Sequence, residues 1–481
     1  MIRMIRQKGK KLKELINKIY FILRKREYFY YLFFVAIFFY TTIVSYEIIP
    51  VASPDSYAYL WLKKAFFKTE LPGISFNYFF FMGRSLTQRS VFHLLGNNFS
   101  LIFLFQSFLN LVVIIVFFKI FKSKIFLRNI LLLIFLSLLQ FSSFFRLSPS
   151  LIGPEPLYFS LFVFFILTIF YFRGSRRNLW LFIVGIFFIF SKQVSPFIVI
   201  VSILLYLLIN YRRVRIKEKV ISSILCIISI CSIFFTQRYD SSVKVNAINN
   251  IFSRVLISKE RINYFINNYS LPKGQYLELC NGGEVNSLCL GIPIYSINKN
   301  TRNYEIMEEA HPFLIWINSN KNYPYIKYCI HNWVDTLEEL NEGFQFVFRK
   351  GPLRFFSEYI DQLSMARVTS HYPKFEIFFL NILGALGTGI NFIFLNHLFF
   401  AIFFNLLVML LIKRHRNLSS IILIIIFSFT ISYLGDGMEH LRHTYISTIL
   451  YIIFTYLLIM KIIFDIFIKL KAYLKSSFYR G

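Results

Sequence analysis

Residues 100–118 read SLIFLFQSFLNLVVIIVFF, nineteen positions without a charged side chain. A helix needs about 20 apolar residues to cross a hydrocarbon core about 30 Å thick. Comparable runs lie near 28–49, 129–145, 157–172, 179–190, 197–211, 220–236, 396–412, 418–434 and 444–460. The sequence therefore predicts an all-α membrane protein with about 10 to 11 spanning helices. The uncertain eleventh is 377–395, whose glycines suit a span or a re-entrant hairpin equally.

The composition excludes several classes of protein. The chain has 481 residues, of which 56% are apolar and 16% are charged. A soluble globular chain carries about 25% charged residues, so this one lacks the polar surface to fold in water alone. Soluble enzymes, coiled coils and disordered regulators are therefore excluded.

The net charge of +29 is distributed unevenly. The two termini and alternate loops hold 30 cations and four acids, whereas residues 237–376 hold 15 cations and 14 acids. The positive-inside rule then predicts that both termini are cytoplasmic and that 237–376 is extracytoplasmic. No RNA- or DNA-binding motif accompanies the charge, so we expect contact with anionic membrane lipid and no nucleic-acid partner.

The predicted organisation has five parts. A basic cytoplasmic N-terminus (1–27) precedes an N-terminal transmembrane module (28–236), whose first outer loop is 50–99. A mostly helical extracytoplasmic insert (237–376) follows, then a C-terminal transmembrane module (377–460) and a basic cytoplasmic tail (461–481). The first apolar run is longer than a signal-peptide core and lacks a cleavage site, so it is predicted to be an uncleaved span.

The five cysteines fall in two groups. Cys226 and Cys231 lie inside a predicted span, where we expect core packing. Cys280 and Cys289 flank a Gly-rich turn in the predicted insert, so they are candidates for a disulfide in an oxidising compartment, with Cys329 left over. Without clustered histidines, zinc is weakly supported.

Polar side chains within the spans include Gln106, Asn110, Gln140 and Asn405. We expect these to hold helices together by hydrogen bonds. A proton-driven transporter usually has carboxylates or histidines buried at mid-membrane, and the predicted spans contain almost none. Chemistry is therefore expected in the outer loops.

Two outer loops each carry one prominent acid. Asp55 precedes an amphipathic stretch that contains Tyr57 and Tyr59 and suits a helix lying in the membrane interface. Glu155 lies between two prolines at the start of a span. Each acid has a structural alternative, namely a helix cap for Asp55 and an anion facing a helix dipole for Glu155.

Two other outer loops are rich in cations. Lys192 follows a short apolar run that rises only about 18 Å, so it is predicted to lie below the outer surface, unless it extends to the interface. Asp436, Glu439, His440, Arg442 and His443 crowd the last outer loop. Arg84, Arg89 and His93 precede the second span. Carboxylates and cations on one outer face suit an anionic, lipid-linked substrate.

Together these loops resemble those of the GT-C glycosyltransferases, such as the dolichyl-phosphate-mannose protein mannosyltransferases. In that family an acidic residue and an interfacial helix follow the first span, as Pro54-Asp55 and 56–64 do here. The Pro154-Glu155 pair, Lys192 in its short turn and Arg442-His443-Thr444-Tyr445 are similar to later family motifs. The resemblance covers about 28–210 and, loosely, 435–460. Two departures concern the acceptor: Ser56 follows Asp55 where many members have a second acid, and the insert lies between spans.

The resemblance implies an inverting transferase. Its donor would be a polyprenyl-phosphate sugar, and its acceptor an envelope glycan, lipid or protein. Asp55 and Glu155 are the expected catalytic residues, and the substrate-binding candidates are Lys192, Arg442, Arg84, Arg89, His440, His443, Tyr57 and Tyr59. No cofactor is required, although Asp55 with Glu155 could hold a divalent metal. The richness in Phe, Ile, Lys and Asn favours a bacterial cytoplasmic membrane.

Three alternative functions remain open. A lipid-linked saccharide flippase or transporter would have polar residues lining several spans and an internal repeat. An outer-face saccharide polymerase would depend on Arg and His residues of the insert. A structural scaffold would leave the clustered outer charges without a role.

Overall fold

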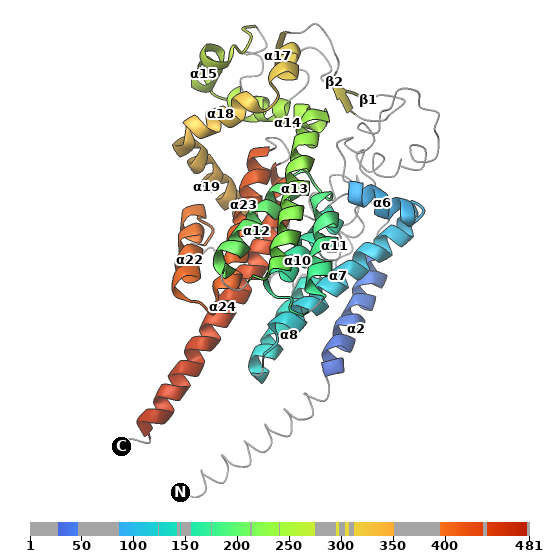
Figure 1. The fold of residues 1–481 in the computed structure, drawn as a ribbon, viewed down its shortest axis with the longest axis vertical. Coiled ribbons are helices and arrows are strands. Elements are labelled where there is room, and N and C mark those ends of the chain that lie inside the picture. Colours follow the sequence, from blue (N-terminus) through green and yellow to red (C-terminus); the bar gives the residue numbers. More distant parts are fainter. Residues whose placement is uncertain are drawn as a thin grey trace, which may run out of the picture.

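The computed structural model describes residues 27–46, 86–123, 125–141, 145, 155–174, 176–211, 214–239, 241–274, 295–297, 304–306, 312–350, 395–435 and 440–478. Apolar helices run along the long axis of the molecule, and a group of shorter helices lies across one end (Figure 1). The end with the shorter helices is called the upper end below. The start of α2 and the end of α24 both lie toward the opposite, lower end.

Ten apolar helices match the ten runs of the sequence. They are α2 (Glu27–Tyr46), α7 (Phe99–Phe121), α8 (Phe126–Phe141), α10 (Glu155–Phe170), α11 (Arg177–Ile189), α12 (Ser195–Asn210), α13 (Ile216–Tyr239), α22 (Leu398–Leu411), α23 (Arg416–Gly435) and α24 (His440–Phe478). Four of them contain stretches long and apolar enough to cross a membrane: Phe99–Phe121, Ile216–Thr236, Arg416–Gly435 and Thr444–Leu470. The other six are apolar but shorter. By length and composition, the described helices therefore suit a multi-span membrane protein.

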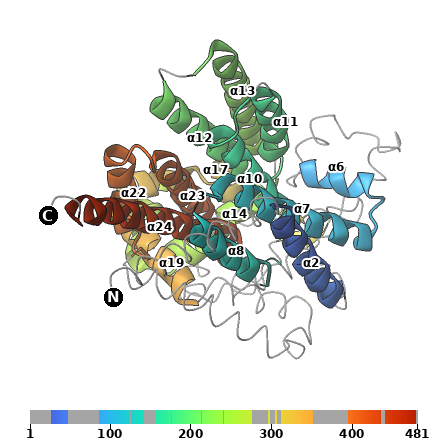
Figure 2. The ribbon, with the colours of Figure 1, turned by 90° about the horizontal axis from the view of Figure 1, so that it is seen from below.

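Helix α10 is the centre of the bundle. Nearly all of its residues are buried, and it contacts α7, α11 and α12. Seen from below, α2, α7 and α8 lie on one side of it, α11, α12 and α13 on another, and α22 to α24 on a third (Figure 2). A helix that is apolar on every side suits such a central position, because protein covers all of its faces.

The shorter helices pack around their own apolar core at the upper end. They are α14 (Ser241–Asn250), the π-helical turn η2 (Ile251–Val255), α15 (Lys259–Tyr269), α17 (Pro312–Asn320) and α18 (Tyr323–His331). Strands β1 (Tyr295–Ile297) and β2 (Tyr304–Ile306) pair antiparallel, with Ser296 opposite Glu305. Helix α19 (Trp333–Lys350) joins this group to the apolar bundle, where it contacts α22, α23 and α24. The described part of 237–376 is thus mostly helical, as predicted.

A buried ion pair ties helices together at the lower end. Arg177 Nη1 lies 3.0 Å from Glu218, and Arg177 Nη2 donates to the Ile169 carbonyl at 2.7 Å. Tyr206 donates to Glu218 at 3.3 Å. The guanidinium therefore satisfies a carbonyl at the end of α10 that has no partner within the helix, while joining α11, α12 and α13.

A second ionic group lies between α22, α23 and α24. The Asp465 carboxylate lies 3.0 Å from Arg414 Nη1 and 3.2 Å from His415 Nε2. Lys461 Nζ donates to the Arg414 carbonyl at 2.9 Å. Burial lowers the pKa of His415, and the Lys461 charge lowers it further, although Asp465 acts in the opposite direction. This group fixes the turn between α22 and α23 to α24.

Helix α24 continues to Phe478, into the residues of the predicted tail, because no Pro or Gly interrupts it. Two sequence predictions need correction. Cys226 packs half-buried against the main apolar core, as expected, but Cys231 is exposed on α13, so the expectation of core packing is wrong for Cys231. Asn405 donates to Ala401 of its own helix and makes no described bond to another helix. Of the undecided segment 377–395, only residue 395 lies within the described residues.

Candidate active site at the upper end of the central helix

Glu155 is the first residue of α10, and its side chain is only 2% exposed. A carboxylate at this position faces the positive end of the helix dipole, which stabilises the charged form. This position is therefore compatible with both predicted roles of Glu155, the anion that faces the helix dipole and the catalytic residue. The prolines at 154 and 156 explain why the helix begins here, since proline suits the first turn and disfavours helix before it.

Lys192 lies in the turn between α11 and α12, and its ammonium points inward. Its Nζ lies 5.3 Å from the centre of the Tyr158 ring, and Tyr158 follows Glu155 by one turn of α10. Tyr158 is buried and stacks on Phe188 of α11. The alternative in which Lys192 extends away to the interface does not match this geometry. The ring face attracts a cation more strongly in such a poorly hydrated place.

A row of hydroxyl groups continues from Tyr158 into the last two helices. The Tyr158 hydroxyl lies 3.5 Å from Ser428 Oγ of α23, and Ser428 Oγ lies 2.9 Å from Ser447 Oγ of α24. We call Tyr158, Ser428 and Ser447 the hydroxyl row. Ser447 follows His443 by one turn of α24. The hydroxyl row therefore links the side of the bundle that holds Lys192 to α24, whose first turn contains residues of the last predicted outer loop.

Helix α6 (Leu86–Leu94) carries Arg89, which is buried. Thr87 fixes this helix to the end of α11, because its Oγ1 donates to the Phe187 carbonyl at 2.7 Å and its backbone N–H donates to Phe190 at 3.2 Å. Both acceptors lie just before Lys192. A tight turn at Gly96 and Asn97, both with positive φ, then leads into α7, which Asn98 caps by accepting from the Leu101 N–H at 3.2 Å.

The structure therefore brings Glu155, Lys192 and the helix of Arg89 to one region. The first turn of α24 contains His440, Arg442 and His443. The structure describes only the backbone of these three residues. The remaining predicted residues, Asp55, Tyr57, Tyr59, Arg84, Cys280 and Cys289, lie outside the described residues. Within the described ranges, no group of three or more His, Cys, Asp or Glu side chains could hold a metal ion. The predicted metal pair of Asp55 with Glu155 includes one residue, Asp55, that lies outside the described ranges.

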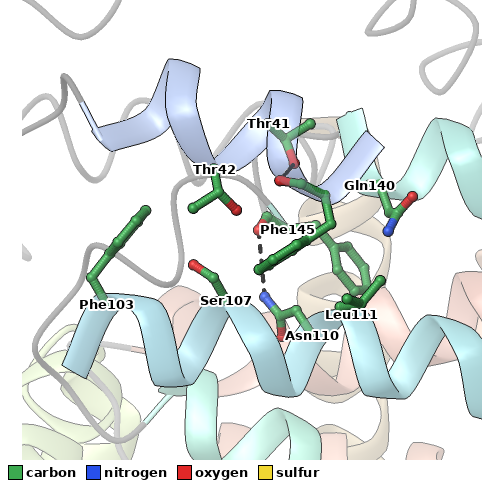
Figure 3. Close-up of a pocket in the computed structure, with 9 residues that line it drawn as sticks. Thr41, Thr42, Phe103, Ser107, Asn110, Leu111, Gln140 and Phe145 are labelled. Atoms are coloured by element: carbon green, nitrogen blue, oxygen red, sulfur yellow. Dashed lines mark hydrogen bonds between the residues drawn. The ribbon is translucent and has the colours of Figure 1, made fainter. Parts of the chain in front are cut away.

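A small cavity lined by both polar and apolar side chains lies between α2, α7 and α8 (Figure 3). Its volume is about 20 Å³, and its lining includes Thr41, Ser107, Asn110 and Gln140. Gln140 donates to the Phe34 carbonyl of α2 and Asn110 to the Phe145 carbonyl, both at 3.4 Å. These two contacts agree with the predicted role of span carboxamides in joining segments of the bundle. The space is on the scale of one water molecule, too small for a sugar.

A larger groove of about 470 Å³ lies between η2, α15 and α19. Arg254 is buried there and donates to Glu339 at 2.6 Å and to the Tyr433 carbonyl of α23. Arg261 donates to the same carboxylate at 3.2 Å. Burial raises the pKa of Tyr325, so its hydroxyl stays protonated where it accepts from Arg254 at 3.1 Å.

Sequence reasoning missed the hydroxyl row and the arginines of this groove. Serines within apolar runs were a signal for the first. Nothing local in the sequence pairs Arg254 with Glu339, 85 positions away.

No known protein family, curated protein or solved structure matches this chain.

Proposed function

We propose that this protein is a membrane glycosyltransferase of the GT-C kind, which moves a sugar from a polyprenyl-phosphate donor to an envelope acceptor. The observation that supports it best is the placement of Lys192. An inward-pointing ammonium at the upper end of the bundle, near the buried Glu155 and the helix of Arg89, suits a phosphate at the membrane surface.

The proposed reaction is a single displacement with inversion. The acceptor hydroxyl oxygen forms a bond to the anomeric carbon, and its proton goes to the carboxylate of Asp55. The bond between that carbon and the phosphate oxygen breaks, and its electron pair stays on the polyprenyl phosphate. Lys192 and Arg442, with Arg84 next, stabilise the charge that develops there. Fixed cations in a poorly hydrated site can supply much of the reduction in barrier.

The decisive experiment uses Asp55→Asn. Asparagine caps a helix nearly as well as aspartate but does not accept a proton in the useful pH range. As a general base, Asp55 should account for roughly 10²–10⁴-fold in rate. We expect the variant to fold, bind donor and transfer almost no sugar, measured with polyprenyl-phosphate donors in liposomes.

A matched control is Glu260→Gln, which changes an exposed acid in the first turn of α15. It should transfer sugar normally. Normal transfer by Asp55→Asn would remove Asp55 from the mechanism and leave Glu155 as the candidate base. If the unmutated protein transfers sugar from no such donor, the flippase and polymerase hypotheses would be favoured.

An outer-face saccharide polymerase is the second candidate, and one observation favours it. The groove beside α19 contains Arg254 and Arg261 in the segment where a polymerase would place its arginines. Both arginines already bind Glu339, which favours a structural role. Elongation of a lipid-linked saccharide without any polyprenyl-phosphate monosaccharide would favour the polymerase.

A further inference from the structure

Helix α18 is apolar on two opposite faces. Tyr325 and Tyr328 are buried in the core of the upper helices, where Tyr328 contacts Tyr264 and Phe265. On the other face, Tyr323, Ile326 and Ile330 are 59%, 52% and 66% exposed. Their spacing of three and four residues places them on one side of the helix. A helix facing water would carry polar side chains there.

The exposed face continues past the end of α18. Trp333 opens α19 and is 61% exposed, and the neighbouring Val334 is also exposed. Lys327 lies at the same side of α18, with its Nζ 4.5 Å from the centre of the Tyr323 ring. Tyr, Trp and Lys beside branched aliphatic residues is the combination found where a protein meets lipid headgroups. We call Tyr323, Ile326, Lys327, Ile330 and Trp333 the α18 face.

The position of α18 relative to the bundle supports the same conclusion. Two contacts fix α19 to the upper end of α22: Asn341 Oδ1 accepts from the Leu398 N–H, and Gln345 Nε2 meets His397 Nδ1, both at 2.9 Å. From there α22 exposes Phe399, Phe403 and Leu410 outward, as a helix in lipid does. Figure 1 shows α18 and α19 on the same side as α22, beside the upper ends of the apolar helices.

We propose that the α18 face lies in the headgroup region of the membrane, as a continuation of the lipid-facing surface of α22. Lipid is the occupant that the composition favours, because Lys327 can reach phosphate while the Tyr, Ile and Trp side chains enter the acyl boundary. The upper helices then rest on the bilayer beside the bundle as well as on α23. This surface is separate from the proposed site of transfer.

The test uses tryptophan fluorescence. The chain has four tryptophans, and a variant with Trp61, Trp180 and Trp316 changed to Phe keeps Trp333 alone. It is reconstituted in vesicles whose lipids carry bromine near the headgroup end of the acyl chain, or deep in the chain. We expect loss of most Trp333 emission with the shallow bromine, a smaller loss with the deep one, and little quenching by aqueous iodide.

The matched control keeps Trp316 alone, which is 7% exposed in the core of the upper helices. Its emission should be unchanged by both bromolipids. Two results would overturn the proposal. Quenching of Trp333 by iodide without bromolipid quenching would place the face in water, and quenching by neither, together with cross-linking between copies through Ile330→Cys, would show that a second copy covers it.

Should the single-tryptophan variant fail to fold, a polarity-sensitive label at Ile330→Cys in a cysteine-free background replaces it. The same label at Lys259→Cys, an exposed position on α15, is the aqueous reference. We expect the emission at position 330 in vesicles to be blue-shifted relative to that at position 259. Equal spectra at 330 and 259 would contradict the lipid assignment.

Discussion

Lys192 is the residue for which the structure makes the proposed chemistry most testable. Lys192→Gln removes the ammonium that lies over Tyr158. Loss of one preorganised charge stabiliser typically costs about 10²–10³ in rate, so we expect a loss of sugar transfer of that size in a folded protein. The measurement is kcat/KM for donor in liposomes, with Tm recorded alongside.

The control for this prediction is Lys219→Gln. Lys219 also lies over a tyrosine ring, at 5.2 Å from Tyr211, but at the lower end of the bundle. Its loss should leave transfer unchanged. Equal effects of the two substitutions would mean that Lys192 acts only through its ring contact.

His415 makes stability depend on pH. Burial and the Lys461 charge lower its pKa from the usual 6.5 despite Asp465. Between 6.5 and the lower pKa of the folded state, the unfolded chain binds the extra proton, so the free energy of unfolding falls as pH decreases through this window. Below the folded-state pKa this contribution stays constant.

We therefore expect Tm in detergent to decrease below pH 6.5, and His415→Gln to reduce that slope. His331→Gln changes an exposed histidine and should keep the slope of the unmutated protein. If the slope survives in His415→Gln, other groups cause it.

At the scale of elements, α19 packs so closely on α23 that residue 343 has room only for glycine. A Cβ at Gly343 would overlap the Tyr433 ring, whereas one at Gly435 meets nothing within 4 Å. Overpacking of this kind costs about 1–3 kcal/mol. Gly343→Ala should thus lower Tm, and Gly435→Ala should not. A normal Tm for Gly343→Ala would show that the ring can move aside.

The attachment of the upper helices depends on Glu339. Glu339→Gln leaves the buried Arg254 without its anion, and breaking a buried pair costs about 3–5 kcal/mol, reduced here because Glu339 is partly exposed. We expect faster amide hydrogen exchange in η2 and α15, with exchange in α10 unchanged. Glu338→Gln, at an exposed neighbouring acid, is the control. Unchanged exchange in Glu339→Gln would remove this pair as the attachment.

The apolar helices could be predicted from sequence because hydrophobic runs are local signals. Each predicted run has its helix, with ends displaced by a few residues where capping decides them, as at Asn98. Which runs are central was not predictable, because α10 and α12 are similarly apolar, yet nearly all of α10 is buried and much of α12 is not. The exposure of Cys231 follows from that limit.

The residues of the candidate site likewise fall into those that could be predicted from sequence and those that could not. Glu155 and Lys192 were found because charges beside apolar runs are conspicuous. Tyr158, Ser428 and Ser447 were not, since their contacts join segments 270 and 19 positions apart. Tertiary packing brings them together, and no local pattern records it.

At the scale of the whole molecule, the charge asymmetry predicts orientation. Reporter fusions after Arg215, at the lower turn before α13, and near residue 300, between β1 and β2, should give opposite signals for the two sides of the membrane. The first should report cytoplasm and the second the outside. Matching signals would refute this topology.

The unequal lengths of the helices have a consequence for the surrounding lipid. The apolar part of α24 has 27 residues and rises about 40 Å, whereas α11 has 13 and rises about 20 Å. A hydrocarbon core of about 30 Å matches neither. Long helices respond by tilting, and short ones by thinning the bilayer around them. Lipid should therefore be thinnest beside α11, which brings the headgroup region closer to the turn that contains Lys192. Acyl-chain length would then regulate how a lipid-linked phosphate reaches that residue.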